Sequence, residues 1–432
     1  MQIKDLLSTG KNGRLMFSGI DTVELAGEYG TPLYVMDEEA IRQNMREYKR
    51  ALEECYGKSS MVCYASKAFA CKEIYRIAMD EGIGADVVSA GELLTAVSVD
   101  FPADKIVFHG NNKSDDELLL ALNCGVGLIA VDNIEEIRTL DKLAKRLDKK
   151  AKISLRIKPG VTAHTHEFIR TGAIDSKFGF ALETGEAMEA VLLAANCESL
   201  ALTGFNCHIG SQIFDAEPFA AAAEVMLEFI AKVQKQTGAP IESLNLGGGF
   251  AIRYTDGDRE VNYREYSLKI AKITKQKCEE LGIPVPFMMI EPGRSIVGNA
   301  GITLYKVGAV KNIPGHRKYV LIDGGFTDNP RYSLYGAKYD IIAADKAAAD
   351  MNETITLAGK CCESGDLIGE NMPAPSLEPG GIVAVLATGA YNYSMASNYN
   401  RLPKPAVVML KGGKSRIVVK RETLNDLLRN DI

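Results

Sequence analysis

Two charged residues that follow short apolar runs have side chains suited to catalysis. Lys67, in Tyr64-Ala-Ser-Lys-Ala, comes after the apolar run 61–65. A lysine in such a place is often only the solvated end of a strand, but partial burial lowers its pKa and frees the amine to form a Schiff base with a carbonyl group. Glu291, in Glu-Pro-Gly-Arg294, comes after the run 287–290. A carboxylate there could keep a pyridine nitrogen protonated, and the protonated ring is an electron sink for a carbanion at Cα.

The residue type at position 291 separates two kinds of chemistry. A glutamate favours the protonated ring that a decarboxylation needs, whereas an arginine would leave the nitrogen neutral, which suits a racemase better. A surface salt bridge between Glu291 and Arg294 is the plainer alternative.

A second group of residues could bind phosphate. The run Gly247-Gly248-Gly249 supplies backbone N–H groups that a phosphate can approach closely. His208 and Ser211, in His-Ile-Gly-Ser, add a flat ring and a hydroxyl donor. Glycine runs are common in turns and a single histidine is more often structural, so the position of these residues in the fold decides their meaning.

Two further clusters lie in the C-terminal part of the chain. Cys361-Cys362-Glu363-Ser-Gly-Asp366 follows a strand-like run, and a thiol beside a carboxylate can donate a proton. A buried structural cysteine is the alternative, and it is the preferred interpretation of Cys361. The segment 389–400, which contains Tyr391, suits a loop that contacts phosphate or substrate, although many such segments are only turns.

The elements that must position these residues form a repeating pattern. Short apolar runs alternate with amphipathic helical stretches, such as 115–125, 133–147 and 217–238, which indicates a parallel sheet. Eight repeats match a (β/α)8 TIM-like barrel, and an open doubly wound sheet is disfavoured because no G-x-G-x-x-G opens a helix after the first strand. The predicted strands are 61–67, 84–89, 105–110, 127–132, 152–159, 202–210, 243–249 and 287–294.

The predicted barrel would bring the candidate residues to one face. Catalytic residues of such barrels lie at the C-terminal ends of the strands, and phosphate often binds beside strands seven and eight. Lys67 ends the first predicted strand, His208 the sixth, the glycine run the seventh, and Glu291 the eighth.

A second domain follows the barrel. After Arg294 the runs read as strands joined by Gly/Pro turns with little helix, which predicts an all-β domain of the β-sandwich or β-barrel kind. The N-terminal runs 15–20 and 31–37 also read as strands. We therefore predict a barrel over 38–295 and a discontinuous β domain formed by 1–37 and 296–432.

Composition restricts the class of protein. The 432 residues are 46% apolar and 25% charged, which is a globular balance in a chain too long for one core. The net charge of −6 argues against nucleic acid as the main partner, and no apolar run is long enough for a membrane span or a signal peptide. The nine cysteines have neither the spacing of a disulfide framework nor that of a metal site. We therefore expect reduced thiols, no bound metal and a cytoplasmic location.

Taken together, these motifs resemble the fold-type III decarboxylases that use pyridoxal 5′-phosphate (PLP), and most closely the diaminopimelate decarboxylase family. The resemblance covers nearly the whole chain, from Tyr34-Val-Met-Asp37 to Ser397-Asn-Tyr-Asn400, and lies in the order YASKA, HIGSQ, GGGF, EPGR, CESGD, GAY. It implies a barrel with a β domain, and decarboxylation of meso-2,6-diaminopimelate at its D-centre to give L-lysine and CO2, the last step of lysine biosynthesis.

The resemblance also implies roles for the matching residues. Lys67 would carry PLP as a Schiff base, His208 would stack on its ring, and Glu291 would pair with its nitrogen. Cys362 would protonate Cα after CO2 leaves; Cys362 and Glu363 would reach the active site of the partner subunit, which implies a homodimer with shared sites. The residues implied near the phosphate or otherwise in contact with PLP are Ser211, Gly248, Gly293, Arg294 and Tyr391.

Substrate selection is implied at the distal end of the substrate. Arg294, Arg331 and Tyr335, with Tyr391, resemble the family's clamp for the second carboxylate, which suits the planar fork of arginine. Glu363 would hold the distal ammonium group. In Asn-Pro-Arg331-Tyr-Ser the expected proline after the arginine is absent. Because two cysteines are adjacent, the role of proton donor is assigned to Cys362 rather than Cys361, since Cys362 is the cysteine that aligns with the CESGD motif.

Two rival functions remain open. One is a related decarboxylase acting on D-ornithine, D-lysine or a polyamine precursor. The other is a regulatory binder without activity, which we would expect to have lost the lysine or the phosphate glycines.

Overall fold

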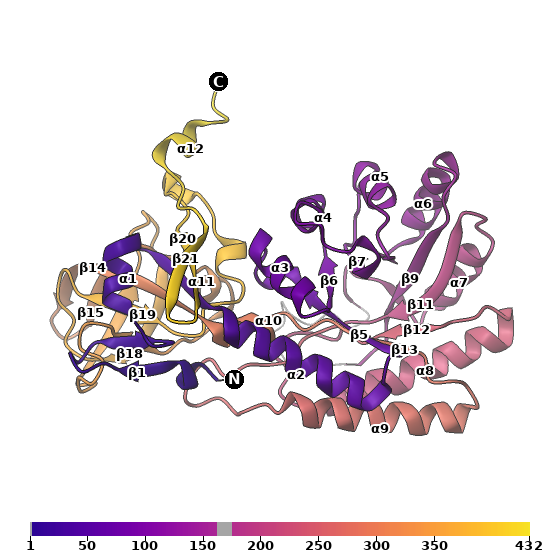
Figure 1. The fold of residues 1–432 in the computed structure, drawn as a ribbon, viewed down its shortest axis with the longest axis horizontal. Helices are drawn as coiled ribbons and strands as arrows, with labels where there is room; N and C mark the ends of the chain where they lie inside the picture. Colours follow the sequence, from indigo (N-terminus) through magenta and orange to yellow (C-terminus); the bar gives the residue numbers. More distant parts are fainter. Residues whose placement is uncertain (1, 162–174) are drawn as a thin grey trace. The chain divides into compact units, whose positions relative to one another are not determined.

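The computed structural model describes residues 2–161 and 175–432 and divides the chain into two compact units (Figure 1). Unit 2 comprises 45–251 and 261–293, and unit 1 comprises 1–44, 252–260 and 294–432.

Unit 2 is built on eight parallel strands that close into a ring. Each strand pairs with the next along the ring, and β8 pairs with β9 to complete it. This closure confirms the predicted (β/α)8 barrel and excludes the open sheet. The strands are β5 (Ser60–Ala65), β6 (Gly84–Val87), β7 (Ile106–Phe108), β8 (Leu128–Val131), β9 (Ala151–Lys158), β11 (Leu200–Asn206), β12 (Ser243–Asn245) and β13 (Phe287–Ile290), with the short β10 (Phe180–Ala181) beside β9.

Capping residues mark where several helices of the barrel begin and end. Ser114 and Glu117 form a reciprocal cap before α5, Asn133 caps α6, and Gly238 ends α8 in the left-handed conformation. Buried Ile137, Leu140 and Leu143 show the periodic apolar face of α6. The helices are α2 (Glu38–Tyr56), α3 (Lys72–Asp80), α4 (Ala90–Val97), α5 (Asp115–Cys124), α6 (Ile134–Arg146), α7 (Glu186–Ala195), α8 (Glu217–Thr237) and α9 (Tyr263–Leu281).

Unit 1 contains a nine-stranded mixed sheet, which confirms a separate β domain. β4 (Leu33–Asp37) lies between β14 (Gly301–Ile313), to which it is antiparallel, and β20 (Ala406–Lys411), to which it is parallel. The other strands of this sheet are β15 (Arg317–Ile322), β16 (Ile341–Ala343), β17 (Glu353–Ala358), β18 (Leu367–Ala374), β19 (Ile382–Val385) and β21 (Lys414–Val419).

Smaller elements complete unit 1. A three-stranded sheet and four helices of four to eight residues belong to it. They are β1 (Leu7–Thr9), β2 (Leu15–Phe17), β3 (Ile20–Asp21), α1 (Thr22–Tyr29), α10 (Arg294–Val297), α11 (Arg331–Tyr335) and α12 (Leu424–Leu428).

Both faces of the large sheet are buried. Along β14, Ile302 and Leu304 belong to one apolar cluster, whereas Tyr305 and Val307 belong to the other. Residues that alternate along a strand point to opposite faces, so the sheet has an apolar core on each side. The buried apolar surface on both sides of the sheet therefore stabilises the β domain, including the loops between its strands.

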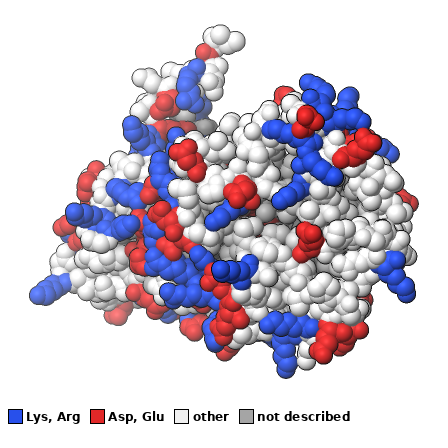
Figure 2. Space-filling view, turned by 45° about the vertical axis from the view of Figure 1, so that its right-hand side comes forward, with Lys and Arg blue, Asp and Glu red and all other residues white. Residues whose placement is uncertain are grey.

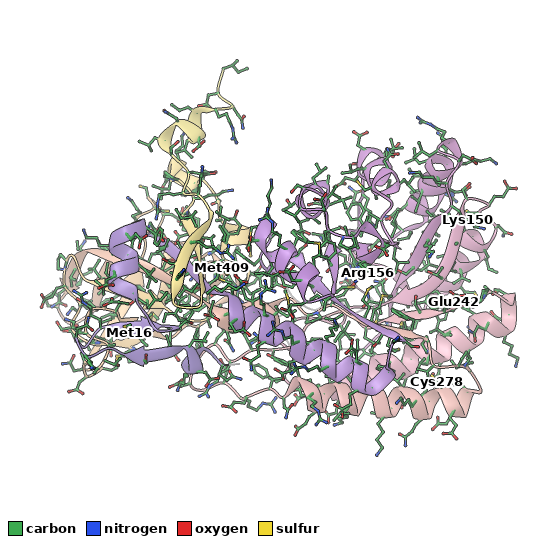
Figure 3. The ribbon with its side chains drawn as sticks, in the orientation of Figure 1. Met16, Lys150, Arg156, Glu242, Cys278 and Met409 are labelled. Atoms are coloured by element: carbon green, nitrogen blue, oxygen red, sulfur yellow. The ribbon has the colours of Figure 1, made fainter. Side chains whose placement is uncertain are left out.

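The surface carries charges of both signs. In Figure 2, acidic and basic side chains are interspersed across the visible face. Among the described residues, no helix combines the length and apolar character needed to cross a bilayer. Figure 3 shows the side chains on the ribbon and labels Arg156, which belongs to β9 of the barrel.

Candidate active site

The carboxyl ends of the barrel strands are tied together beyond the strands themselves. The N–H of Glu291 donates to the carbonyl of Gly247 (2.8 Å), and that of Ala65 donates to the carbonyl of Pro292 (3.1 Å). The N–H of His109 likewise donates to the carbonyl of Val87 (2.8 Å). These bonds hold the loops that leave β7, β12 and β13 in fixed register, so the first residue of each loop is as well placed as the strand before it.

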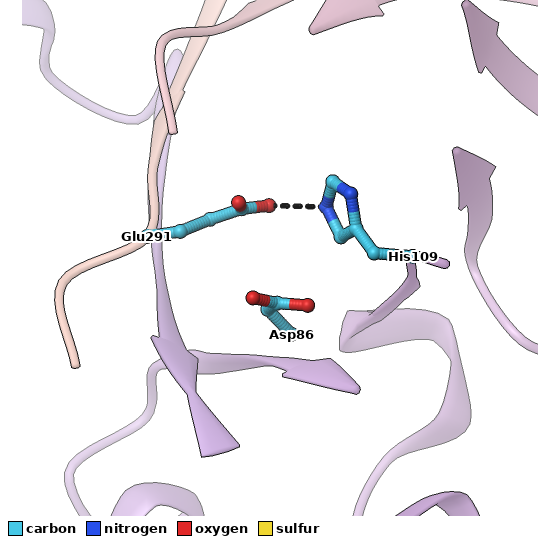
Figure 4. Close-up of side chains that lie close together, drawn as sticks. All are labelled: Asp86, His109 and Glu291. Atoms are coloured by element: carbon cyan, nitrogen blue, oxygen red, sulfur yellow. Dashed lines mark hydrogen bonds and ion pairs between the residues drawn. The ribbon is translucent and has the colours of Figure 1, made fainter. Parts of the chain in front are cut away.

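A buried group of acidic and imidazole side chains lies at this end of the barrel. Asp86, His109 and Glu291 each offer an atom within 4.8 Å of the others (Figure 4). Nε2 of His109 lies 2.7 Å from Oε1 of Glu291. These three donors could ligate a divalent cation, but the hydrogen bond that already joins two of them would have to break.

The electrostatics of this group keep Glu291 ionised. Burial alone would raise the pKa of Glu291, but the interaction with His109, helped by Lys67 and Asn245, outweighs it and holds the pKa well below its usual range. Burial, together with the negative charge of Glu291, raises the pKa of Asp86. The site therefore keeps an anion at position 291, as the predicted pairing with a pyridine nitrogen requires.

Lys67 lies close to this group. It belongs to a short 3-10 turn, Ser66–Ala68, which directly follows β5, so the strand ends two residues earlier than predicted. Its Nζ lies 3.7 Å from Oδ2 of Asp86, and its side chain is 41% exposed. The hydroxyl of Ser66 anchors the turn by donating to the carbonyl of Asp86 (2.7 Å). The amine is thus held beside a buried carboxylate yet remains accessible.

The glycine run forms a close-packed turn after β12. A Cβ on Gly248 would lie 2.1 Å from the carbonyl oxygen of Glu291, and one on Gly249 would lie 2.3 Å from that of Gly210. Gly247 has a φ of 70°, a conformation that favours glycine. Only glycine fits these positions, so no Cβ covers the turn and a ligand can approach its backbone closely, as an anion-binding turn needs. The N–H of Gly247 donates to Oδ1 of Asn245 (2.8 Å).

His208 and Ser211 lie on the loop that meets this turn. The N–H of Gly248 donates to Nδ1 of His208 (3.3 Å). Burial, together with the positive charges of Lys67 and Arg156, lowers the pKa of His208 well below its usual value, so its flat ring is uncharged at neutral pH. Ser211 lies two residues before Ile213, which forms a parallel bridge with Phe250. The site of unit 2 thus combines an accessible amine, a buried carboxylate, a neutral ring and a glycine turn.

A second cluster of candidate residues lies in unit 1 and consists of arginines and tyrosines. Arg294, at the start of α10, donates to the hydroxyl of Tyr254 and stacks over the ring of Tyr391 at 4.7 Å. Arg331, at the start of α11, stacks over the ring of Tyr254 at 4.8 Å and donates to the hydroxyl of Tyr339 (2.8 Å). Tyr254 and Tyr339 are functional candidates that sequence reasoning missed.

The charges of this arginine–tyrosine cluster make it suitable for an anion. Arg331 is only 6% exposed, and the contacts of its guanidinium group within the described parts of the chain are with Tyr254 and Tyr339. Burial would raise the pKa of Tyr254, but Arg294 and Arg331 outweigh burial and lower it. The buried guanidinium group of Arg331, which contacts tyrosine rings and a tyrosine hydroxyl, favours a carboxylate ligand. Tyr335 ends α11 and is partly exposed.

The two adjacent cysteines have different environments. Cys361 is buried, with Sγ 4.0 Å from Oγ1 of Thr327, and burial raises the pKa of its thiol to about 11. Cys362 and Glu363 are exposed. Asp366 shapes the loop by accepting the N–H groups of Phe326 (2.6 Å) and Cys361 (2.7 Å). The aspartate that ends the motif therefore presents Cys362 and Glu363 outward.

Comparisons with known proteins agree with this set of residues. The family model described as "Pyridoxal-dependent decarboxylase, pyridoxal binding domain" matches residues 38–298. The chain is 46% identical to the diaminopimelate decarboxylase of Bacillus subtilis (98% of this chain, 96% of the relative) and 44% identical to that of Staphylococcus aureus (98% of both). The structure of diaminopimelate decarboxylase from M. jannaschii in co-complex with L-lysine aligns with a TM-score of 0.93 at 37% identity, covering 100% of this chain and 99% of that one. The chain therefore belongs to the pyridoxal-dependent decarboxylases, and within them to the diaminopimelate decarboxylases.

Proposed function

We propose that Lys67 and Glu291 carry out the decarboxylation of meso-2,6-diaminopimelate at its D-centre, giving L-lysine and CO2 as the last step of lysine biosynthesis. The observation that carries this proposal is the buried, ionised carboxylate of Glu291 at the same end of the barrel as the accessible amine of Lys67.

The residues of the site fit PLP. The amine of Lys67 would bind its aldehyde, the neutral ring of His208 would stack on it, and Glu291 would hold its ring nitrogen protonated. When bound, the cofactor supplies an electron sink for the negative charge left at Cα as CO2 departs. Its phosphate and remaining polar groups would be held by Ser211, Gly248, Gly293, Arg294 and Tyr391.

Side chains of the protein would hold the amine of Lys67 in place and supply the proton that Cα needs. Lys67 would hold the cofactor's aldehyde, and Asp86, whose Oδ2 lies 3.7 Å from its Nζ, would keep the amine at that place during exchange with the substrate amine. Cys362 donates the thiol proton that replaces the departing carboxylate at Cα, and the thiolate recovers a proton from solvent.

The arginine–tyrosine cluster supplies selectivity for the substrate. Arg294, Arg331 and Tyr335 would bind the distal carboxylate, with Tyr391 beside them, and Glu363 would bind the distal ammonium group. A substrate without the second carboxylate leaves buried donors unpaired, which costs far more than the loss of an apolar contact.

Turnover of competing amino acids tests this proposed function. With PLP present, we expect CO2 release from meso-diaminopimelate to exceed that from lysine or ornithine by roughly 10⁴-fold in kcat/KM, the scale of rejection when a buried polar site stays unfilled. Comparable rates with lysine or ornithine would instead support a related decarboxylase.

We also propose a homodimer in which Cys362 and Glu363 complete the partner subunit's active site. Their exposure supports this assignment, because a buried thiol such as Cys361 cannot reach another subunit. The absence of disulfides among all nine cysteines supports a cytoplasmic location.

Replacing each cysteine separately tests the proton donor. Cys362→Ala should lower kcat by roughly 10²-fold or more, the usual contribution of a general acid, whereas Cys361→Ala should mainly lower thermal stability. Mixing Cys362→Ala subunits with Lys67→Ala subunits should restore about a quarter of the wild-type activity, because about half of all dimers would combine the two variants and each of these would contain one intact site of two. The opposite order of effects would exchange the roles of the two thiols, and no recovery on mixing would reject shared sites.

A further inference from the structure

His109 and Asn245 hold the carboxylate on which the proposed function depends. His109 directly follows β7, and Asn245 is the last residue of β12. Both are buried, at 7% and 0% exposure. Neither belongs to the motifs that identify the family in the sequence.

Both side chains donate to the same oxygen of Glu291. Nε2 of His109 lies 2.7 Å, and Nδ2 of Asn245 lies 2.6 Å, from Oε1. The orientation of the Asn245 amide is fixed, because its Oδ1 accepts the N–H of Gly247 (2.8 Å) and its NH2 group must therefore face Glu291. An imidazole nitrogen that bonds to a carboxylate must carry the proton, which places a hydrogen on Nε2 of His109.

The second oxygen of Glu291 is left for another ligand. Within the described parts of the chain, both hydrogen bonds to this side chain are made to Oε1 and none to Oε2. The carboxylate of Asp86 lies within 4.8 Å, and two buried like charges this close oppose each other's ionisation. Glu291 therefore needs strong donors on Oε1 if Oε2 is to act as an anion.

We infer that His109 and Asn245 are positioning residues, which fix and stabilise the charge on Oε1 of Glu291 so that Oε2 keeps the cofactor's ring nitrogen protonated. This inference rests on the proposed role of Glu291. Hydrogen bonds to an anion lower its affinity for a proton, so the proton shared between carboxylate and ring stays on the ring. Asn245 also joins this carboxylate to Gly247, and thus to the glycine turn in which the next residue, Gly248, is proposed to hold the phosphate.

The protonation of the ring nitrogen can be measured directly. The protein is loaded with PLP that carries ¹⁵N in its ring, and the ¹⁵N chemical shift is recorded at neutral pH. We expect the protonated shift in the wild type and in His109→Gln, whose amide can place an N–H where Nε2 lies. His109→Leu and Asn245→Ala should each move the shift toward the unprotonated value and lower kcat by roughly 10- to 100-fold, the effect of losing one hydrogen bond to a charged group.

Asn206→Ala is the matched control. Asn206 lies opposite Asn245 in the register of β11 and β12, and its Oδ1 accepts the hydroxyl of Ser154 (3.1 Å) rather than contacting Glu291. Loss of a buried amide at this position should leave the ¹⁵N shift at its wild-type value. Circular dichroism and retained PLP identify the variants that fold, and either His109→Leu or Asn245→Ala is sufficient for the comparison.

The outcomes separate this inference from the proposed function. Wild-type shifts in the folded His109→Leu and Asn245→Ala proteins would overturn the positioning role, while a changed shift in Glu291→Gln would leave the role of Glu291 intact. A wild-type shift in Glu291→Gln would contradict the proposed function itself.

Discussion

Replacing Lys67 with alanine should abolish the visible absorbance of bound PLP and lower kcat by at least about 10³-fold. We propose that the amine of Lys67 binds the cofactor covalently and would also accept and return protons during exchange with the substrate, a contribution that alone is typically about 10²–10⁴-fold. Absorption spectra of the PLP-loaded variant and single-turnover CO2 release measure the two effects.

Lys72→Ala is the matched control for this variant. Lys72 is an exposed lysine at the start of α3, five residues further along the chain. Its replacement should leave the spectrum and the rate at wild-type values. A visible band that survives in Lys67→Ala would show that another amine binds the cofactor.

Replacing Arg331 with alanine should weaken the use of diaminopimelate at least roughly 30-fold in kcat/KM, mostly through KM. Truncating one member of a buried charge pair costs about 2–5 kcal/mol, and each 1.4 kcal/mol corresponds to about tenfold. Arg331→Lys should recover only part of the loss, because a point charge cannot replace the planar fork that Tyr339 orients. Steady-state kinetics with meso-diaminopimelate measure the effect.

The control for Arg331 is another arginine of unit 1. Arg317 forms an ion pair with Glu370 (2.7 Å) and is partly exposed, so Arg317→Ala should leave KM unchanged. An unchanged KM in Arg331→Ala would remove Arg331 from the substrate clamp.

Much of the fold could be predicted because a parallel barrel buries both faces of each strand. The resulting apolar runs were separated by helices with clear caps, such as Asn133 and Gly238, and all eight strands lie within or beside the predicted runs. β18 carries a weak strand pattern because Gly369 and Pro373 interrupt it, which a strand at the edge of a sheet tolerates. β16 has only three residues and carries too little pattern.

The site could be predicted only where a motif marked it. Lys67, His208 and Glu291 stood out because each follows a strand within a recognisable run. Asp86, His109 and Asn245 lie at the same end of the barrel, and the signal that could have found them was a polar side chain within the apolar predicted strands 84–89, 105–110 and 243–249. Tyr254 and Tyr339 had no such signal, because neither belongs to a motif. Tyr254 meets Arg294 from 40 positions away, and Tyr339 meets Arg331 from eight positions away.

Release of CO2 from meso-diaminopimelate, measured on protein stripped of PLP and again after PLP is restored, tests the central claim most directly. If Lys67 and Glu291 act together on one cofactor, no CO2 should be released before PLP is added. After PLP is added, CO2 and L-lysine should form in equal amounts. Release without PLP, or none after the cofactor has bound, would contradict the account.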